Sequence, residues 1–202
     1  MDILQEFVHR EFIQQELEFS ELYRYLDRYG DAGTEWVQEA NIERNGRIKL
    51  NRTIWMFWKQ GLENAPELVK KCHDSVCRNV PDGFEIVLLS DQNLSKYIRL
   101  PDYIWDKYEK GYITTTHLSD MIRMELLCMY GGCWIDATVF CSGAMPMYML
   151  TGEMFVFKLP SVLSVPVVKL SSWWMFSDSR NRLIHLTRQM LYEYWKQEVD
   201  MR

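Results

Sequence analysis

The two segments that decide the fold are Ser119–Arg123, with the sequence SDMIR, and Tyr130–Asp136, with the sequence YGGCWID. Asp120 and Arg123 lie three residues apart, so on a helix they share one face. The paired glycines let the chain leave that helix through backbone angles that are closed to other residues. The pattern predicts a helix, a tight turn and a short buried strand, and it brings two carboxylates and one guanidinium together.

A carboxylate follows the predicted apolar strand directly. Asp136 is costly to bury there without a partner, and a divalent cation is a good partner. Magnesium and manganese prefer oxygen ligands, commonly one or two carboxylates completed by substrate phosphates. Thr138 lies two residues further, on the same side of an extended segment, where its hydroxyl could support a metal-bound water. The alternative interpretation is that Asp136 is a turn or cap residue.

The helix that carries Asp120 also has a purely structural interpretation. If Ser119 caps that helix, Asp120 sits in the first turn, where the helix dipole favours a carboxylate. Arg123 would then neutralise Asp120 or a neighbouring group. Sequence alone leaves this alternative open.

The rest of the chain predicts an α/β fold with an N-terminal helical appendage over residues 1–47. Apolar and β-branched runs predict strands at 53–58, 84–89, 133–136, 153–158 and 172–176. Helical patterns near 66–76, 101–110, 118–130 and 180–198 alternate with them, which indicates a mostly parallel sheet between helices. Ligands of such sheets bind at the carboxyl ends of the strands. The residues that fall at or just beyond these ends are Trp58, Ser90, Asp91 and Asp136.

Three roles remain open for the appendage. Apolar residues recur there at helical spacing, which favours a lid packed on the main domain. An oligomer contact and a membrane-surface helix are the alternatives. The polar face contains glutamates and few lysines, which predicts weak attraction to an anionic membrane.

Composition narrows the functional class. A net charge of −5 argues against nucleic-acid binding, which usually needs a basic face. The 5 cysteines include no Cys-x-x-Cys pair and predict reduced thiols in a cytosolic protein. A zinc site at Cys72, His73 and Cys77 is disfavoured by its spacing. No signal peptide is recognisable at the N-terminus, and no apolar run approaches the roughly 18 residues of a membrane span.

These motifs resemble those of the capsular polysaccharide synthesis proteins, a bacterial group of predicted glycosyltransferases. That group is related to the sugar transferases with an Asp-x-Asp motif and, more distantly, to the glucosylating toxins. The resemblance runs from about Ile48 to the C-terminus, and residues 1–47 match no recognised pattern. The residues that carry it are Ile54, Trp55, Trp58, Gly61, Ala65, Pro66, Leu100, Pro101, Asp102, Ser119, Asp120, Arg123 and the segment from Tyr130 to Thr138.

The resemblance implies a GT-A type fold, a Rossmann-like mixed sheet flanked by helices, as a nucleotide-sugar-binding catalytic domain over residues 48–202. It further implies Mn²⁺ or Mg²⁺ and a retaining transfer from a nucleotide-sugar, with UDP-sugars favoured. Asp136 would hold the metal, Asp120 hydroxyls of the sugar or ribose, and Arg123 the sugar or diphosphate. Trp58 would stack on the base, with Asn93 beside the nucleoside. Trp55 is the next candidate for stacking.

The sequence departs from the wider pattern in two ways. Thr138 replaces the second acid of Asp-x-Asp, so we expect weaker metal binding before the donor arrives. Family members generally continue beyond the helix that ends near Glu198, which leaves a truncated form or a short natural form as alternatives.

The expected function is therefore glycosyl transfer to a glycan or lipid-linked glycan in capsular or surface polysaccharide synthesis. The expected location is the cytoplasm, at the inner face of a membrane. No anchor is recognisable in the sequence. A non-catalytic nucleotide-sugar-binding scaffold is the alternative, which Thr138 and the early end of the chain favour slightly.

Overall fold

A computed structural model describes residues 51–158 and 170–198, together with Ser20, Arg24 and Arg28, which are helical. Most of the predicted appendage at 1–47 therefore lies outside the described residues. Within them, the predicted alternation of strands and helices is confirmed.

The sheet has five strands in the order β2-β1-β3-β5-β4. β1 pairs in parallel with β2 and with β3, whereas β5 runs antiparallel to both β3 and β4. The α/β class is thus confirmed and the sheet is mixed. Only its β2-β1-β3 half is the parallel sheet that the alternation predicted. The strand bounds are Thr53–Phe57 for β1, Glu85–Leu89 for β2, Gly132–Ile135 for β3, Met154–Lys158 for β4 and Leu170–Ser177 for β5.

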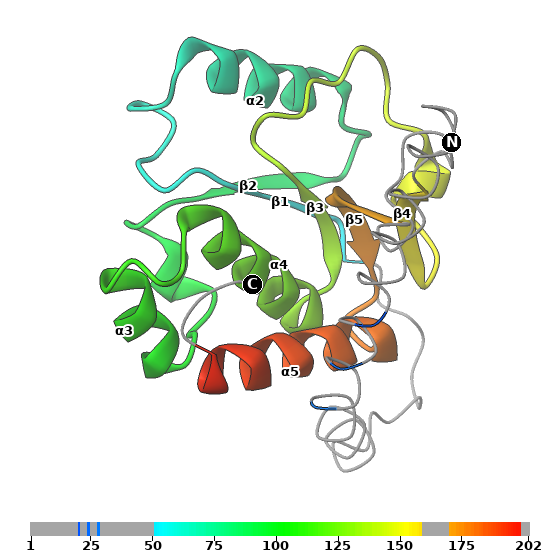
Figure 1. Ribbon diagram of the computed structural model, residues 1–202. Coiled ribbons are helices and arrows are strands. Elements are labelled where there is room, and N and C mark those ends of the chain that lie inside the picture. The colour runs from blue at the N-terminus through cyan, green and yellow to red at the C-terminus, as the bar shows by residue number, and fades with distance from the viewer. Residues whose placement is uncertain (1–19, 21–23, 25–27, 29–50, 159–169, 199–202) are drawn as a thin grey trace, which may run out of the picture.

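Helices cover both faces of this sheet (Figure 1). On β1, Ile54 and Met56 point to the face covered by α2, while Trp55 and Phe57 point to the face covered by α4 and α5. This alternation buries both faces, as expected for the parallel half of a sheet between helices. The helix bounds are Glu67–Asn79 for α2, Asp102–Glu109 for α3, Thr115–Met129 for α4 and Arg182–Gln197 for α5, with short 3₁₀ turns at Leu94–Lys96 and Met147–Met149.

The start of α4 differs from the prediction. Thr114 caps the helix, and its hydroxyl Oγ1 accepts a hydrogen bond from the backbone N–H of His117 at 3.3 Å. Ser119 is therefore not the cap, and Asp120 lies in the second turn rather than the first. The helix dipole consequently does not account for an acidic residue at position 120, because its effect is confined to the first turn.

The glycine break between α4 and β3 is confirmed. Gly131 and Gly132 have φ angles of 67° and 97°, which disfavour any other residue. A Cβ atom on Gly132 would lie 2.5 Å from the carbonyl oxygen of Thr53, and one on Gly131 would lie 2.8 Å from that of Ser177. The close approach of three strand ends at this turn therefore requires both glycines.

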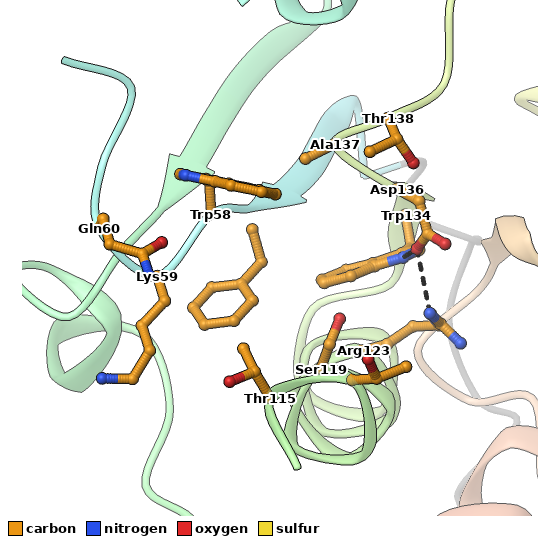
Figure 2. A pocket seen from close by; sticks show the side chains of 12 residues that line it. Trp58, Lys59, Gln60, Thr115, Ser119, Arg123, Trp134, Asp136, Ala137 and Thr138 are labelled. Atoms are coloured by element: carbon orange, nitrogen blue, oxygen red, sulfur yellow. Dashed lines mark hydrogen bonds and ion pairs between the residues drawn. The ribbon is translucent and has the colours of Figure 1, made fainter. Parts of the chain in front are cut away.

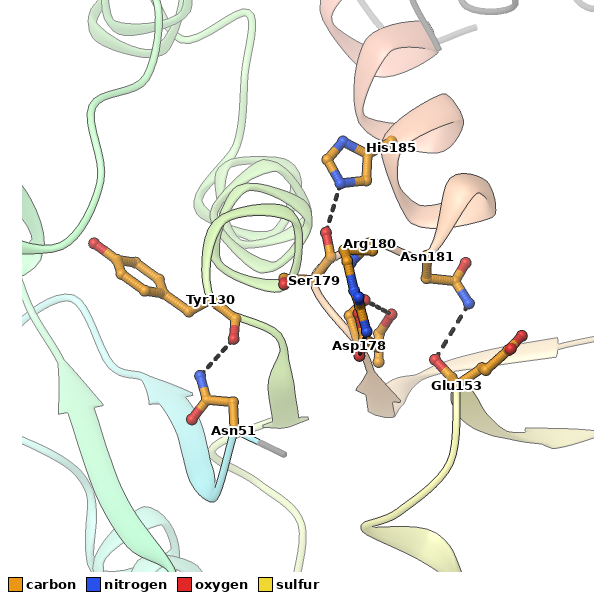
Figure 3. A network of polar contacts seen from close by, with 9 residues as sticks. Asn51, Tyr130, Glu153, Asp178, Ser179, Arg180, Asn181 and His185 are labelled. Carbon is orange, nitrogen blue, oxygen red and sulfur yellow. Dashed lines mark hydrogen bonds and ion pairs between the residues drawn. The ribbon is translucent and has the colours of Figure 1, made fainter. Parts of the chain in front are cut away.

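Polar side chains at this end of the sheet form hydrogen bonds with nearby backbone groups and with one another (Figure 3). The Asn51 side chain donates to the carbonyl of Tyr130 at 2.6 Å, tying the start of β1 to the end of α4. Asn181 caps α5 and donates to the carbonyl of Glu153 at 3.2 Å. The candidate site lies at the opposite end, where β1 and β3 finish.

Candidate functional site

A pocket of about 500 Å³ opens at the carboxyl ends of β1 and β3 (Figure 2). Its walls come from the end of β1, the first half of α4, and the end of β3 with the three residues that follow. This is the position that the sheet topology predicts for a ligand. The lining residues are Phe57, Trp58, Lys59, Gln60, Thr115, Thr116, Ser119, Arg123, Trp134, Asp136, Ala137 and Thr138.

Asp120, Arg123 and Asp136 come together as predicted, and we call them the pocket cluster. Arg123 Nη1 lies 2.8 Å from Asp120 Oδ1, and Nη2 lies 3.0 Å from Asp136 Oδ1. The arginine side chain is only 4% exposed, whereas the side chains of Asp120 and Asp136 are 38% and 34% exposed. One buried guanidinium thus bridges two half-exposed carboxylates, so the cluster carries an excess negative charge when both acids are ionised.

Burial raises the pKa of the Asp120 carboxyl above its ordinary value. Attraction to Arg123 opposes this rise, and repulsion from Asp136 adds to it. The arginine is shared between two acids and therefore does not fully offset burial. A cation that bound near Asp136 would relieve the same repulsion.

Trp134 contacts the pocket cluster, although it was not among the site residues predicted from the sequence. Its indole Nε1–H donates to Asp136 Oδ1 at 2.6 Å, and the guanidinium carbon of Arg123 lies 5.1 Å from its ring centroid. The signal was present in the sequence: residues 134 and 136 fall on the same side of an extended segment.

Trp58 lines the pocket just beyond the end of β1, where the base of a nucleotide was expected to stack. Its indole Nε1 is buried and has no hydrogen-bond partner among the described residues. Lys59 follows it, and the ammonium lies 2.6 Å from Asp91 Oδ2. This hydrogen bond raises the pKa of Lys59 and ties the exits of β1 and β2 together.

Two residues from the sequence analysis lie elsewhere. Asn93 is outside the pocket lining: its Oδ1 accepts from the N–H of Ser90 at 2.8 Å, and its Nδ2 donates to the carbonyl of Leu88 at 3.0 Å. Both ends of the amide are thus used in closing the turn after β2. Trp55, the second candidate for stacking, is 3% exposed and packs in the core, so that expectation was wrong.

The donor set suits a metal held jointly with a substrate. Among the described residues, no group of three or more His, Cys, Asp or Glu side chains is placed to hold a metal ion. In the pocket, Asp136 Oδ1 already accepts two hydrogen bonds, which leaves Oδ2. Thr138 is exposed at the pocket wall. Such a site fits an ion whose other ligands are diphosphate oxygens.

The tryptophan pair on β5 divides between core and surface. Trp174 is 4% exposed in the core, whereas Trp173 is 37% exposed and stacks on Phe157 with ring centroids 4.7 Å apart. Both line a second, smaller pocket of about 330 Å³. Its lining residues carry no charged side chain, which sets it apart from the pocket beside Asp136.

Comparison of the sequence with known proteins identifies a family. The family model described as capsular polysaccharide synthesis protein matches residues 4–201. The match therefore includes most of residues 1–47, and the expectation that the resemblance begins near Ile48 was too narrow. No helix among the described residues is both long enough and apolar enough to cross a membrane.

The curated relatives are fungal. Glycosyltransferase afumC of Aspergillus fumigatus is 32% identical over 93 residues, covering 42% of this chain and 24% of the relative. O-glycosyltransferase braB of Annulohypoxylon truncatum is 30% identical over 118 residues, covering 54% and 28%. O-glycosyltransferase PaGT of Phomopsis amygdali is 27% identical over 93 residues, covering 42% and 23%.

The chain thus spans about a quarter of the length of these relatives. No solved structure matches it. Because the family model covers nearly every residue, from 4 to 201, the chain belongs to the capsular polysaccharide synthesis protein family.

Proposed function

We propose that this protein is a metal-dependent glycosyltransferase with a GT-A type fold. It would transfer a sugar from a nucleotide-sugar, with UDP-sugars favoured, to a hydroxyl of a glycan or lipid-linked glycan. Family membership and the similarity to three named glycosyltransferases support the reaction class. The capsular role, the bacterial source and the cytoplasmic location rest on the family resemblance, whereas the named relatives are fungal.

The observation that carries the proposal is the pocket cluster at the carboxyl ends of β1 and β3. Two carboxylates share one guanidinium there, and one of them, Asp136, lines a pocket of about 500 Å³. Arg123 Nε and Trp58 Nε1 are buried donors without partners among the described residues, and both side chains line the pocket. Unpaired buried donors are costly, and oxygen atoms of a bound donor substrate would satisfy them after a small adjustment.

Each residue then has a distinct part in the reaction. Asp136 would hold Mn²⁺ or Mg²⁺, with Thr138 placed to bind a metal-bound water. Arg123 would orient Asp136 and add positive charge beside the diphosphate, while Asp120 would bind hydroxyls of the donor. A bound metal ion would offset the charge that develops on the departing nucleoside diphosphate. The acceptor hydroxyl would attack while held beside the sugar, and we propose retention of configuration by analogy with related transferases.

The test is donor hydrolysis. The protein would be incubated with a panel of UDP- and GDP-sugars, with Mn²⁺ or with EDTA, and release of the nucleoside diphosphate measured. We expect release from at least one UDP-sugar, dependent on Mn²⁺. Equal rates with EDTA would remove the metal from the proposal, and the absence of both turnover and binding across the panel would remove the transferase function.

A non-catalytic nucleotide-sugar-binding scaffold is the second candidate. The observations in its favour are Thr138 in place of a second acid and the engagement of Asp136 Oδ1 by two donors. The same panel separates the two functions. Mn²⁺-dependent binding of a UDP-sugar without turnover would favour the scaffold.

A further inference from the structure

We propose that Trp134 is a positioning residue that sets which carboxylate oxygen of Asp136 meets the cation. The inference rests on the proposed function and deepens it. Trp134 sits on β3, between β1 and β5, with its indole 1% exposed. Burial in the core therefore restrains the ring, and its N–H is a preset donor rather than a mobile one.

The indole engages Asp136 at one oxygen. Trp134 Nε1 donates to Oδ1 at 2.6 Å, and Arg123 Nη2 donates to the same oxygen at 3.0 Å. Two donors on Oδ1 fix the carboxylate and leave Oδ2 as its ligand oxygen. A carboxylate restrained in this way loses less freedom when it binds a cation, which is the usual contribution of groups that hold a metal ligand.

Trp134 also acts on the second donor. The guanidinium of Arg123 lies over the indole face, 5.1 Å from the ring centroid. A cation over an aromatic face is attracted to it, so the ring supports Arg123 in its bridging position. The same side chain thus contacts both Asp136 and the arginine that helps to orient it (Figure 2).

Two other buried tryptophans show that packing alone does not demand this arrangement. Trp55 donates to the backbone carbonyl of Gly131 at 2.8 Å, which is a purely structural bond. Trp174 on the adjacent β5 has a buried Nε1 without a partner among the described residues. Of the three, only Trp134 donates to a side chain of the pocket cluster.

The test separates the N–H from the ring. Trp134→Phe keeps an aromatic face and removes the donor; incorporation of 3-benzothienylalanine at position 134 keeps the bicyclic shape and replaces the N–H by sulfur. Isothermal titration would measure UDP binding with and without Mn²⁺ for the full chain. We expect both variants to weaken Mn²⁺-dependent UDP binding by about tenfold to a hundredfold, with metal-free UDP binding unchanged. Trp174→Phe, which removes an indole N–H without an acceptor, is the matched control and should bind as the wild type does.

The outcomes distinguish this inference from the proposed function. If wild-type protein shows no Mn²⁺-dependent UDP binding, the metal-binding role of Asp136 in the proposed function fails. If wild type shows it and the benzothienyl variant retains full affinity, the positioning role of Trp134 is overturned while the function stands. Equal losses with and without Mn²⁺ would likewise overturn it, because Trp134 would then support the pocket wall and not Asp136. Should Trp134→Phe fail to fold, the benzothienyl variant decides.

Discussion

Helix α4 carries two arginine–carboxylate clusters with similar chemistry and different surroundings. One faces the pocket and the other faces α5. They are the pocket cluster, Asp120, Arg123 and Asp136, and the interhelical cluster, Glu125, Arg188 and Tyr192.

The difference lies in charge balance and in exposure. In the interhelical cluster Glu125 Oε2 accepts from the Tyr192 hydroxyl at 2.7 Å and lies 3.3 Å from Arg188 Nη1, with the two ionic side chains 11% and 13% exposed. Among the described residues, one acid there pairs with one arginine between the two helices. In the pocket cluster two acids share one arginine, and each acid is about a third exposed. A closed and balanced group ties helices together, whereas an open group with surplus negative charge can take a cation.

The largest expected effect tests the pocket cluster. Asp136→Asn keeps the shape of the side chain and removes the charge that would hold the metal. We expect Mn²⁺-dependent release of nucleoside diphosphate to fall by about a hundredfold or more, since charge stabilisation of a leaving group has that size. The midpoint of urea unfolding should change little. Retained activity in a folded Asp136→Asn protein would show that the surplus charge has no catalytic use.

The matching change in the interhelical cluster should act on stability instead. Glu125→Gln leaves an acceptor for Tyr192 but removes the ion pair between Glu125 and Arg188. We expect a loss of about 2 kcal/mol in the free energy of unfolding, as for a hydrogen bond to a charged group, with UDP binding unchanged. Glu67→Gln is the control, because the Glu67 side chain is 78% exposed. A drop in UDP affinity for Glu125→Gln would mean that the two clusters are coupled through α4.

A third substitution tests the pocket wall at Trp58. Trp58→Ala removes the proposed stacking surface for the base, which no residue of the interhelical cluster could replace. We expect UDP affinity to fall by about tenfold, within the range measured for base–aromatic stacking. Trp173→Ala is the control, because Trp173 is 37% exposed and does not line the pocket that contains Asp136. Equal affinity in both variants would place the base elsewhere.

The smallest expected effect is on pH dependence. The pKa of Asp120 is raised in the folded protein, first by burial, so its contribution to stability is present at low pH and declines as pH rises through the folded pKa. Asn does not titrate. Asp120→Asn should therefore become more stable relative to wild type as pH rises from about 4 towards 7, the window that begins near an ordinary Asp pKa. Urea unfolding across this range measures the difference.

The control for this prediction is Asp102→Asn, whose side chain is 88% exposed and pairs only loosely with Arg99 at 4.0 Å. Its stability relative to wild type should follow pH much less. If Asp120→Asn instead became less stable relative to wild type as pH rises, attraction to Arg123 would outweigh burial at this carboxylate.

Local sequence predicted the fold well because hydrophobic periodicity and glycine positions act over short distances. The segment from Tyr130 to Asp136 predicted a turn and a buried strand. The structure confirms the need for glycine there, because a Cβ atom on Gly132 would lie 2.5 Å from the carbonyl oxygen of Thr53. The start of α4 was missed because Thr114 and Ser119 are equally good caps by residue type. Only the extended backbone of Thr114 distinguishes them.

The candidate site was predicted in part. Asp120, Arg123 and Asp136 were named from sequence, and in the structure a carboxylate oxygen of each acid lies within 3.0 Å of a nitrogen of Arg123. Asn93 was named beside them, but its amide is used by the backbone of Ser90 and Leu88. Sequence could not show this, because the partners of a side-chain amide depend on how its own turn closes.

The residue pattern alone predicted that a helix bearing Asp120 and Arg123 leads through paired glycines into a strand that ends next to Asp136. Periodicity and glycine conformations are local properties, so a single chain reveals them. The bridging of both acids by Arg123 and the hydrogen bond from Trp134 to Asp136 became visible only in the folded chain. Those contacts depend on how closely α4 packs against β3, and that distance is set by the core on both sides of the sheet.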